Sequence, residues 1–121
     1  MPLDTRQVCS RLPGREIVWL ETTGSTMIEA ARLAADGCPS GTAVVAEEQT
    51  AGQGRYGRSW HSERESGLYI SIVLRLPLPA ADAPVLTLAL GLAIAEAIAR
   101  TADLACDLRW LFQEEIARFV E

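Results

Sequence analysis

Hydrophobic and polar residues recur along the chain with spacings that predict three strands in its first 76 residues. Short β-prone runs predict strands over 16–21 and 42–48, and strict alternation predicts a half-buried strand over 68–76. The third strand has two distinct faces. One face holds Leu68, Ile70, Ile72, Leu74 and Leu76, and the other holds Tyr69, Ser71, Val73 and Arg75.

A first helix is predicted over 27–36, after a turn that follows the first strand. Thr26 and Glu29 have the spacing of a capping box, in which each side chain satisfies a backbone N–H of the first turn. Gly37 followed by Pro39 ends the helix, because glycine adopts the left-handed conformation of a helix end and proline cannot continue the helix.

A second helix is predicted over 85–101. Asp82 acts as an Asx cap, and Pro84 lies in the first turn, where a missing N–H costs nothing. The helix is apolar almost all round, so we expect it to be well buried. Beyond it, residues 106–110 begin a fourth strand, and residues 111–120 return to helical spacing.

The predicted order of elements is β-α-β-β-α-β-α. Two strands that are adjacent in sequence favour an α+β fold, a mixed sheet with flanking helices, over a doubly wound parallel sheet. A length of 121 residues allows one domain with a modest core, so we expect a single domain over 1–121.

The composition of the chain argues against several classes of function. A net charge of −5 argues against a general nucleic-acid surface. All 11 basic residues are arginines, so any mechanism that needs a lysine from this chain is excluded. Cys9, Cys38 and Cys106 are widely spaced and odd in number, which favours free thiols in a reducing cytosol. His61 is the only histidine, so a zinc site lacks ligands.

The sequence shows no targeting signal that we recognise, so we expect a cytoplasmic protein. No charged start precedes an apolar stretch at the N-terminus, so we expect no signal peptide. The longest uncharged run, 83–95, is too short to span a bilayer, so we expect no membrane association.

The most informative segment is 46–60, which holds three glycines, two arginines and a tryptophan between two predicted strands. Glycine allows close approach of the backbone to a ligand, and the arginine fork suits phosphate. This composition predicts a loop that wraps a phosphorylated small molecule.

Two familiar phosphate motifs fit this segment only in part. Gly52, Gly54 and Gly57 match G-x-G-x-x-G, and Gly57-Arg58-Ser59 matches the end of a nucleotide-hydrolase phosphate loop with Arg in place of Lys. Both motifs require a helix after the glycines, whose N-terminus binds the phosphate. The next regular element is a strand, so we exclude both.

Several segments, in this order, resemble the catalytic domain of biotin–protein ligases. They are 23–27 (Thr-Gly-Ser-Thr-Met), 46–60, 67–76, 86–98 and 106–110. The resemblance covers about residues 15–110 and implies the class II synthetase-like biotin/lipoate ligase fold, here incomplete. It implies that biotin and Mg²⁺-bound ATP form biotinyl-AMP, and that a lysine of the biotin carboxyl carrier protein of acetyl-CoA carboxylase then attacks it. Positive charge near the α-phosphate would lower the barrier to the first step, and a loop that excludes water would protect biotinyl-AMP from hydrolysis.

The resemblance also assigns site residues. Ser25, Thr26 and Met27 match a Ser-Thr-Asn turn that holds the ureido head of biotin, and Gln49 matches a position beside that head. The alternatives are that Thr26 only caps the helix with Glu29, and that Gln49 is a solvated strand end.

In the glycine segment, the resemblance adds Gly52 to the substrate-binding residues. Gln53, Gly54 and Arg55 match an Arg-Gly-Arg centre, and Arg55 and Arg58 face phosphate as the catalytic residues. Trp60 closes the base of the loop. The alternatives are solvated arginines and a core tryptophan.

The chain also departs from the family pattern. Met27 replaces Asn, and Gln53 replaces Arg. The family continues with a strand that carries a lysine, whereas residues 111–121 form an atypical tail and contain no lysine. We therefore expect a truncated, impaired ligase, with a non-catalytic biotin-binding module or a lipoate- or octanoate-transferring relative as alternatives. We also expect no DNA binding, and an open strand edge that favours self-association.

Overall fold

The computed structural model describes residues 4–53 and 55–105, and the chain divides into two compact units, Met1–Arg75 and Leu76–Glu121. Each unit is described by itself, and the single domain over 1–121 stays a prediction. The strand predicted over 106–110 and the helix predicted over 111–120 lie outside the described residues.

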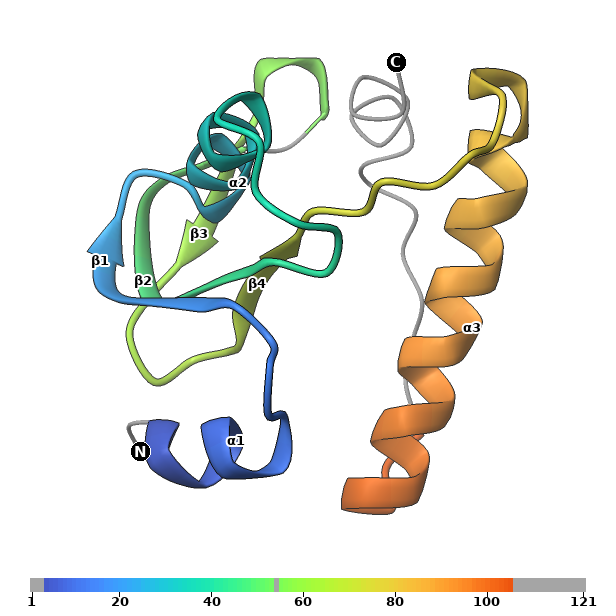
Figure 1. The fold of residues 1–121 in the computed structure, drawn as a ribbon. Coiled ribbons are helices and arrows are strands. Elements are labelled where there is room, and N and C mark those ends of the chain that lie inside the picture. Colours follow the sequence, from blue (N-terminus) through green and yellow to red (C-terminus); the bar gives the residue numbers. More distant parts are fainter. Residues whose placement is uncertain (1–3, 54, 106–121) are drawn as a thin grey trace. The chain divides into compact units, whose positions relative to one another are not determined.

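The first unit is a mixed sheet with helices, which confirms the predicted α+β class (Figure 1). The second unit contains a short 3-10 turn, η2, and a long helix, α3. The elements are α1 (Thr5–Arg11), β1 (Ile17–Thr23), α2 (Thr26–Ala35), β2 (Ala43–Gln53), the 3-10 turn η1 (Arg55–Gly57), β3 (Ser59–Ser62), β4 (Tyr69–Ile72), η2 (Ala80–Asp82) and α3 (Ala83–Ala102).

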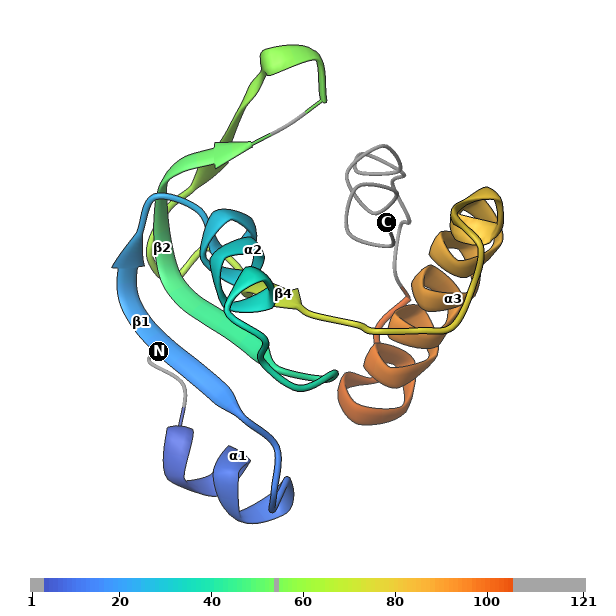
Figure 2. The same cartoon turned by 45° about the horizontal axis from the view of Figure 1, so that its top comes forward.

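The longest strand, β2, lies at the centre of the sheet. On one side it pairs in parallel with β1, from Ile17 opposite Ala43 to Thr23 opposite Gln49. On the other side β4 and β3 pair antiparallel with successive parts of β2. Beyond the end of β1, the β2–β3 hairpin continues away from the rest of the sheet (Figure 2). The parallel β1–α2–β2 unit therefore brings the carboxyl ends of two strands to the same edge.

The core lies between α2 and one face of the sheet. Its buried apolar residues are Ala30 of α2, Val44 of β2 and Val73, which follows β4. Partly buried side chains pack around them, namely Val18, Leu20, Leu33, Ala34 and Cys38. The alternate positions of β1 and β2 supply the apolar side chains that α2 covers, which explains why short β-prone runs were enough to predict these two strands.

The two faces of β4 are used in a way that the sequence did not indicate. Val73 is 9% exposed in the core, and Ser71 shares its face. Ile70 and Ile72 lie on the opposite face and are 43% and 55% exposed. The physical reason is that α2, the helix that packs on this sheet among the described residues of the unit, lies on the side of Ser71 and Val73.

Alternation places Trp19 and Val45, which is 6% exposed, on the same face as Ile70. The indole Nε1–H of Trp19 is buried and has no hydrogen-bond partner among the described residues. The sheet face opposite α2 therefore carries mainly apolar side chains, which are exposed at Ile70 and Ile72.

One helix and one strand were not predicted, and neither were the two 3-10 turns. Helix α1 is short and exposed. The one feature of the sequence that marks its start is the N-cap Asp4, whose side chain accepts from the N–H of Gln7 at 3.1 Å. Strand β3 lies in a polar segment without alternation. Because β3 pairs with β2, β2 runs to Gln53, five residues beyond the predicted end.

Helix α3 begins two residues earlier and ends one residue later than predicted. Pro84 lies in its first turn, as predicted. Asp82 occupies the N-cap position, but its side chain makes no capping hydrogen bond, so the predicted Asx cap is wrong. The C-cap of the helix is Asp103, whose φ of 53° places it in the left-handed region.

The predicted burial of α3 is also wrong. Only Ala83 and Thr87 of this helix are buried, while Val85 is 68% exposed and Leu92 is 58% exposed. By length and composition, the helical stretch Ala80–Ala102 with a mean hydropathy of 1.6 could cross a membrane, so the short uncharged run did not exclude this. A core helix of a soluble protein meets the same criteria, so the feature alone assigns no location.

Candidate functional site

The predicted binding turn lies between β1 and α2, where Ser25 is 3% exposed. Ser25 is the N-cap of α2, and its Oγ accepts from the N–H of Met27 at 3.2 Å. The capping box predicted for Thr26 and Glu29 is therefore wrong. Glu29 instead bonds Arg32, and this exposed hydrogen bond and ion pair raise the pKa of Arg32.

Thr26 points to the strands instead of capping the helix. Its backbone N–H donates to Oε1 of Gln49 at 2.8 Å, and its Oγ1 lies 3.1 Å from the same oxygen. Thr26 Oγ1 also lies 2.8 Å from Oγ of Ser71 on β4. Gln49 is thus no solvated strand end, because its oxygen satisfies an N–H of the first turn of α2 that has no partner within the helix.

The other end of the Gln49 amide reaches β3. Its Nε2 donates to Oγ of Ser62 at 3.0 Å, and Ser62 is 3% exposed. A chain of side-chain hydrogen bonds therefore joins β4, α2, β2 and β3 through Ser71, Thr26, Gln49 and Ser62.

Gly52 lies on β2 directly opposite Trp60 of β3 and is buried. A Cβ at this position would lie 2.7 Å from the carbonyl oxygen of Trp60 and 2.9 Å from Oγ of Ser62. The pairing is irregular between Gln49 and Gly52, as at a β-bulge. Glycine is required at this position because the two strands approach closely. This part of the predicted loop is a β-hairpin, since β2 and β3 are paired here.

The hairpin is anchored to the binding turn. The N–H of Ala51 donates to the carbonyl oxygen of Gly24 at 2.8 Å, and Oγ1 of Thr50 lies 3.5 Å from the carbonyl oxygen of Thr23. The glycine segment therefore begins beside Ser25.

The end of the hairpin is the 3-10 turn η1, in which Tyr56 has a φ of 58°. The glycines are followed by strand β3 and not by an α-helix. The exclusion of both the dinucleotide fingerprint and the nucleotide-hydrolase loop is therefore confirmed.

An open hollow of about 450 Å³ lies along the hairpin, lined by residues 48–50 and 59–63. Gln49 and Ser62 reach it from the hydrogen-bonded chain, and Trp60, 44% exposed, lines it as well. At its rim, Nε2 of His61 lies 2.7 Å from Oε1 of Glu63. The hollow therefore combines an aromatic surface with polar groups whose positions are set by hydrogen bonds.

The remaining predicted residues lie on or near the hairpin. Gln53 and Arg58 are exposed, and the backbone of Arg55 belongs to η1. Gly54 and the side chain of Arg55 lie outside what the structure describes. Met27 is partly buried, and its backbone N–H donates to Oγ of Ser25.

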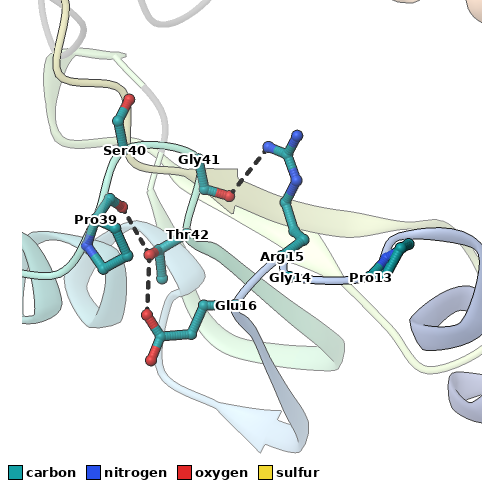
Figure 3. Close-up of a pocket in the computed structure, with 8 residues that line it drawn as sticks. All are labelled: Pro13, Gly14, Arg15, Glu16, Pro39, Ser40, Gly41 and Thr42. Atoms are coloured by element: carbon teal, nitrogen blue, oxygen red, sulfur yellow. Dashed lines mark hydrogen bonds between the residues drawn. The ribbon is translucent and has the colours of Figure 1, made fainter.

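A second pocket, of about 230 Å³, lies at the amino ends of β1 and β2 (Figure 3). There Nη1 of Arg15 donates to the carbonyl oxygen of Gly41 at 3.4 Å. Oγ1 of Thr42 lies 2.7 Å from the carbonyl oxygen of Pro39 and 3.5 Å from Oε2 of Glu16. None of the predicted site residues lines this pocket, which lies at the opposite strand ends from Gln49.

Sequence reasoning missed Ser62 and Ser71. Ser71 carried a usable signal, since it is a small polar residue between two apolar neighbours, on the face of β4 with Val73. Ser62 carried none, because the segment around it lacks periodicity.

Comparison with known proteins places this geometry in a family. Residues 19–112 match the model of the biotin/lipoate A/B protein ligase family. The bifunctional ligase/repressor BirA of Bacillus spizizenii is 37% identical over 97 residues, which are 80% of this chain and 30% of that protein. The biotin–[acetyl-CoA-carboxylase] ligase of Mycobacterium tuberculosis is 35% identical over 109 residues, covering 81% of this chain and 40% of that protein.

Among solved structures, the biotin protein ligase of Leishmania major in complex with biotinyl-5-AMP is similar, with a TM-score of 0.64 and 35% identity. The match covers 84% of this chain and 41% of that one. This chain thus spans less than half the length of each relative. The sequence match, the fold and the ordered turn and hairpin agree, and the chain belongs to the biotin/lipoate A/B protein ligase family.

Proposed function

We propose that this chain is part of an ATP-dependent ligase that joins biotin to a lysine of the biotin carboxyl carrier protein of acetyl-CoA carboxylase. The observation that carries the proposal is the hydrogen-bonded chain through Thr26 and Gln49 beside the glycine hairpin. The names of the relatives support it, since they include a biotin–[acetyl-CoA-carboxylase] ligase and a ligase holding biotinyl-5-AMP. We propose that it acts as a soluble enzyme in the cytoplasm.

The turn and the strand end supply the biotin-binding groups. A ureido head carries two N–H donors and a carbonyl acceptor, and it needs short polar partners held in place. Ser25, Thr26 and Gln49 provide them, with Ser25 and Thr26 buried and Gln49 partly buried. Preorganised groups of this kind cost little ordering when the ligand binds. Met27 contributes its backbone, because its side chain cannot donate or accept strongly.

The hairpin supplies the phosphate-binding groups. In the first step, a carboxylate oxygen of biotin bonds to the α-phosphorus of ATP, and pyrophosphate leaves. Mg²⁺ enters with ATP, because it prefers phosphate oxygens and water. Arg55 and Arg58 neutralise the charge that accumulates where two anions meet, and Gly52, Gln53 and Gly54 let the backbone approach.

In the second step, the amine of the carrier lysine attacks the acyl carbon of biotinyl-AMP, and AMP leaves. Trp60 at the base of the hairpin lines the hollow and limits access of water to the mixed anhydride. The sequence has no lysine and has Gln53 in place of an arginine, so the protein supplies less positive charge to compensate that of the phosphate. We therefore propose that this chain alone is an impaired catalyst.

Two alternatives make different predictions. A non-catalytic module would bind biotin or biotinyl-AMP without turnover. A lipoate- or octanoate-transferring relative would bind the fatty acid in preference to biotin, and the family as a whole includes lipoate ligases. The dense run of glycine and arginine favours an adenylate-binding ligase.

Replacement of Thr26 by Val is expected to weaken biotin binding about three- to tenfold, because it removes, at constant shape, the hydroxyl that bonds both Gln49 and Ser71. Thr101→Val is the matched control, since Thr101 is exposed near the end of α3 and its hydroxyl donates to the carbonyl oxygen of Ala97, away from the binding turn in the sequence. Isothermal titration calorimetry with biotin, lipoate and octanoate measures both variants. Equal affinity of the two variants for biotin, or a preference for octanoate, would contradict the assignment.

Arg55→Ala and Arg58→Ala are each expected to weaken binding of a non-hydrolysable biotinyl-adenylate analogue about tenfold, because a charged hydrogen bond to phosphate is lost. Binding of biotin alone should not change. Arg6→Ala, on the exposed helix α1, is the control. Loss of biotin affinity in both hairpin variants would instead indicate a collapse of the site.

Biotin-dependent exchange of pyrophosphate into ATP is expected to be undetectable or very slow with this chain, because part of the charge at the phosphate is missing. A radiolabel exchange assay with and without biotin measures it. Fast exchange that Arg55→Ala abolishes would refute the impairment and confirm the phosphate site.

Self-association is expected through β4, whose second edge has no partner strand among the described residues, and through Ile70 and Ile72, which are exposed on the sheet face opposite α2. Sedimentation velocity should show a concentration-dependent species that Ile72→Lys shifts toward monomer. Ile28→Lys on α2, at 51% exposure, is the matched control. A monomer that melts in one sharp two-state transition would refute this expectation.

A further inference from the structure

The orientation of the Gln49 amide is dictated by its neighbours. The backbone N–H of Thr26 can only donate, so the Gln49 atom that faces it at 2.8 Å must be the amide oxygen. The hydroxyl of Thr26 lies 3.1 Å from the same oxygen. Two donors therefore occupy the oxygen, and the nitrogen must point the other way.

The nitrogen meets Ser62. Nε2 of Gln49 lies 3.0 Å from Oγ of Ser62, and the only group it can use there is a lone pair of the hydroxyl. The hydroxyl of Ser62 then donates toward the carbonyl oxygen of Trp60 at 3.4 Å. The direction of donation is thus consistent along the chain from Ser71 through Thr26 and Gln49 to Ser62, and such chains strengthen each bond.

The place of Ser62 is set by the irregular pairing at Gly52. Oγ of Ser62 would lie 2.9 Å from a Cβ at position 52, so a side chain there would displace the hydroxyl that Gln49 uses. Gly52 therefore does more than permit a bend. It leaves the space in which Ser62 reaches back across the hairpin to the strand end.

One donor of Gln49 remains. An amide nitrogen carries two N–H groups, and Ser62 takes one of them. Gln49 and Ser62 both line the hollow along the hairpin. We propose that Ser62 is a positioning residue, which holds the Gln49 amide so that its second N–H is offered to a carbonyl-type oxygen of the ligand in this hollow. The inference rests on the proposed biotin site and assigns its Gln49 group as a donor.

A double-mutant cycle tests whether Ser62 acts through Gln49. The dissociation constant for biotin is measured by calorimetry for the unsubstituted chain, Ser62→Ala, Gln49→Ala and the double variant. We expect Ser62→Ala to weaken binding about three- to tenfold, and to have no further effect once Gln49 is Ala. Ser66→Ala, at an exposed serine between β3 and β4, should leave the affinity unchanged. Equal losses in both backgrounds would overturn the proposal.

A second measurement needs neither a ligand nor a substituted chain. In ¹⁵N-labelled protein, one side-chain N–H of Gln49 should exchange with water about tenfold more slowly than those of the exposed Gln7, because one hydrogen bond protects it. Exchange as fast as that of Gln7 would overturn the proposal. A chain that does not bind biotin but shows this protection would refute the proposed function while supporting the role of Ser62.

Discussion

The side chain of Gln49 is the contact on which the site depends. The first N–H groups of any helix lack intrahelical partners, and in α2 the N–H of Thr26 finds its partner on β2, while that of Met27 uses Ser25. A glutamine on the central strand thereby fixes where the helix starts relative to the sheet. The same amide continues to Ser62, so the start of α2 and the base of the hairpin are joined by one side chain.

The glycine segment combines two requirements that usually conflict. A phosphate loop must bring its backbone close to a ligand, and a strand must keep its ladder. Here β2 and β3 remain paired as far as Gln53 and Ser59, and the close approach is confined to Gly52, where a Cβ would collide with the backbone of Trp60. Arg55 and Arg58 thus belong to a hairpin whose base is anchored beside Ser25.

Local pattern was enough to predict β1, α2, β2 and α3 to within a few residues, because alternation and helical spacing follow from burial of one face. It failed where a distant partner decided the outcome. Thr26 and Ser25 both suit an N-cap, and the choice between them depends on Gln49, which lies 23 residues away. Strand β3 has no periodicity of its own and forms because β2 offers an edge. The covered face of β4 depends on the side on which α2 packs. The candidate site was found largely through the family resemblance, which is why Ser62 and Ser71 were overlooked.

Recognition and catalysis are separable in this architecture. Recognition of a ureido head, as proposed above, requires neutral hydrogen-bonding groups in fixed positions, and the bonds that hold Thr26, Gln49 and Ser62 in place are formed without ligand. Adenylation requires, in addition, fixed positive charge at the α-phosphate, and electrostatic stabilisation is commonly the largest contribution to such a rate. In this sequence that charge comes from arginines alone. Because kcat depends only on interactions that are stronger in the transition state than in the ground state, a loss of charge at the phosphate would lower the rate without lowering the affinity of the turn for its ligand.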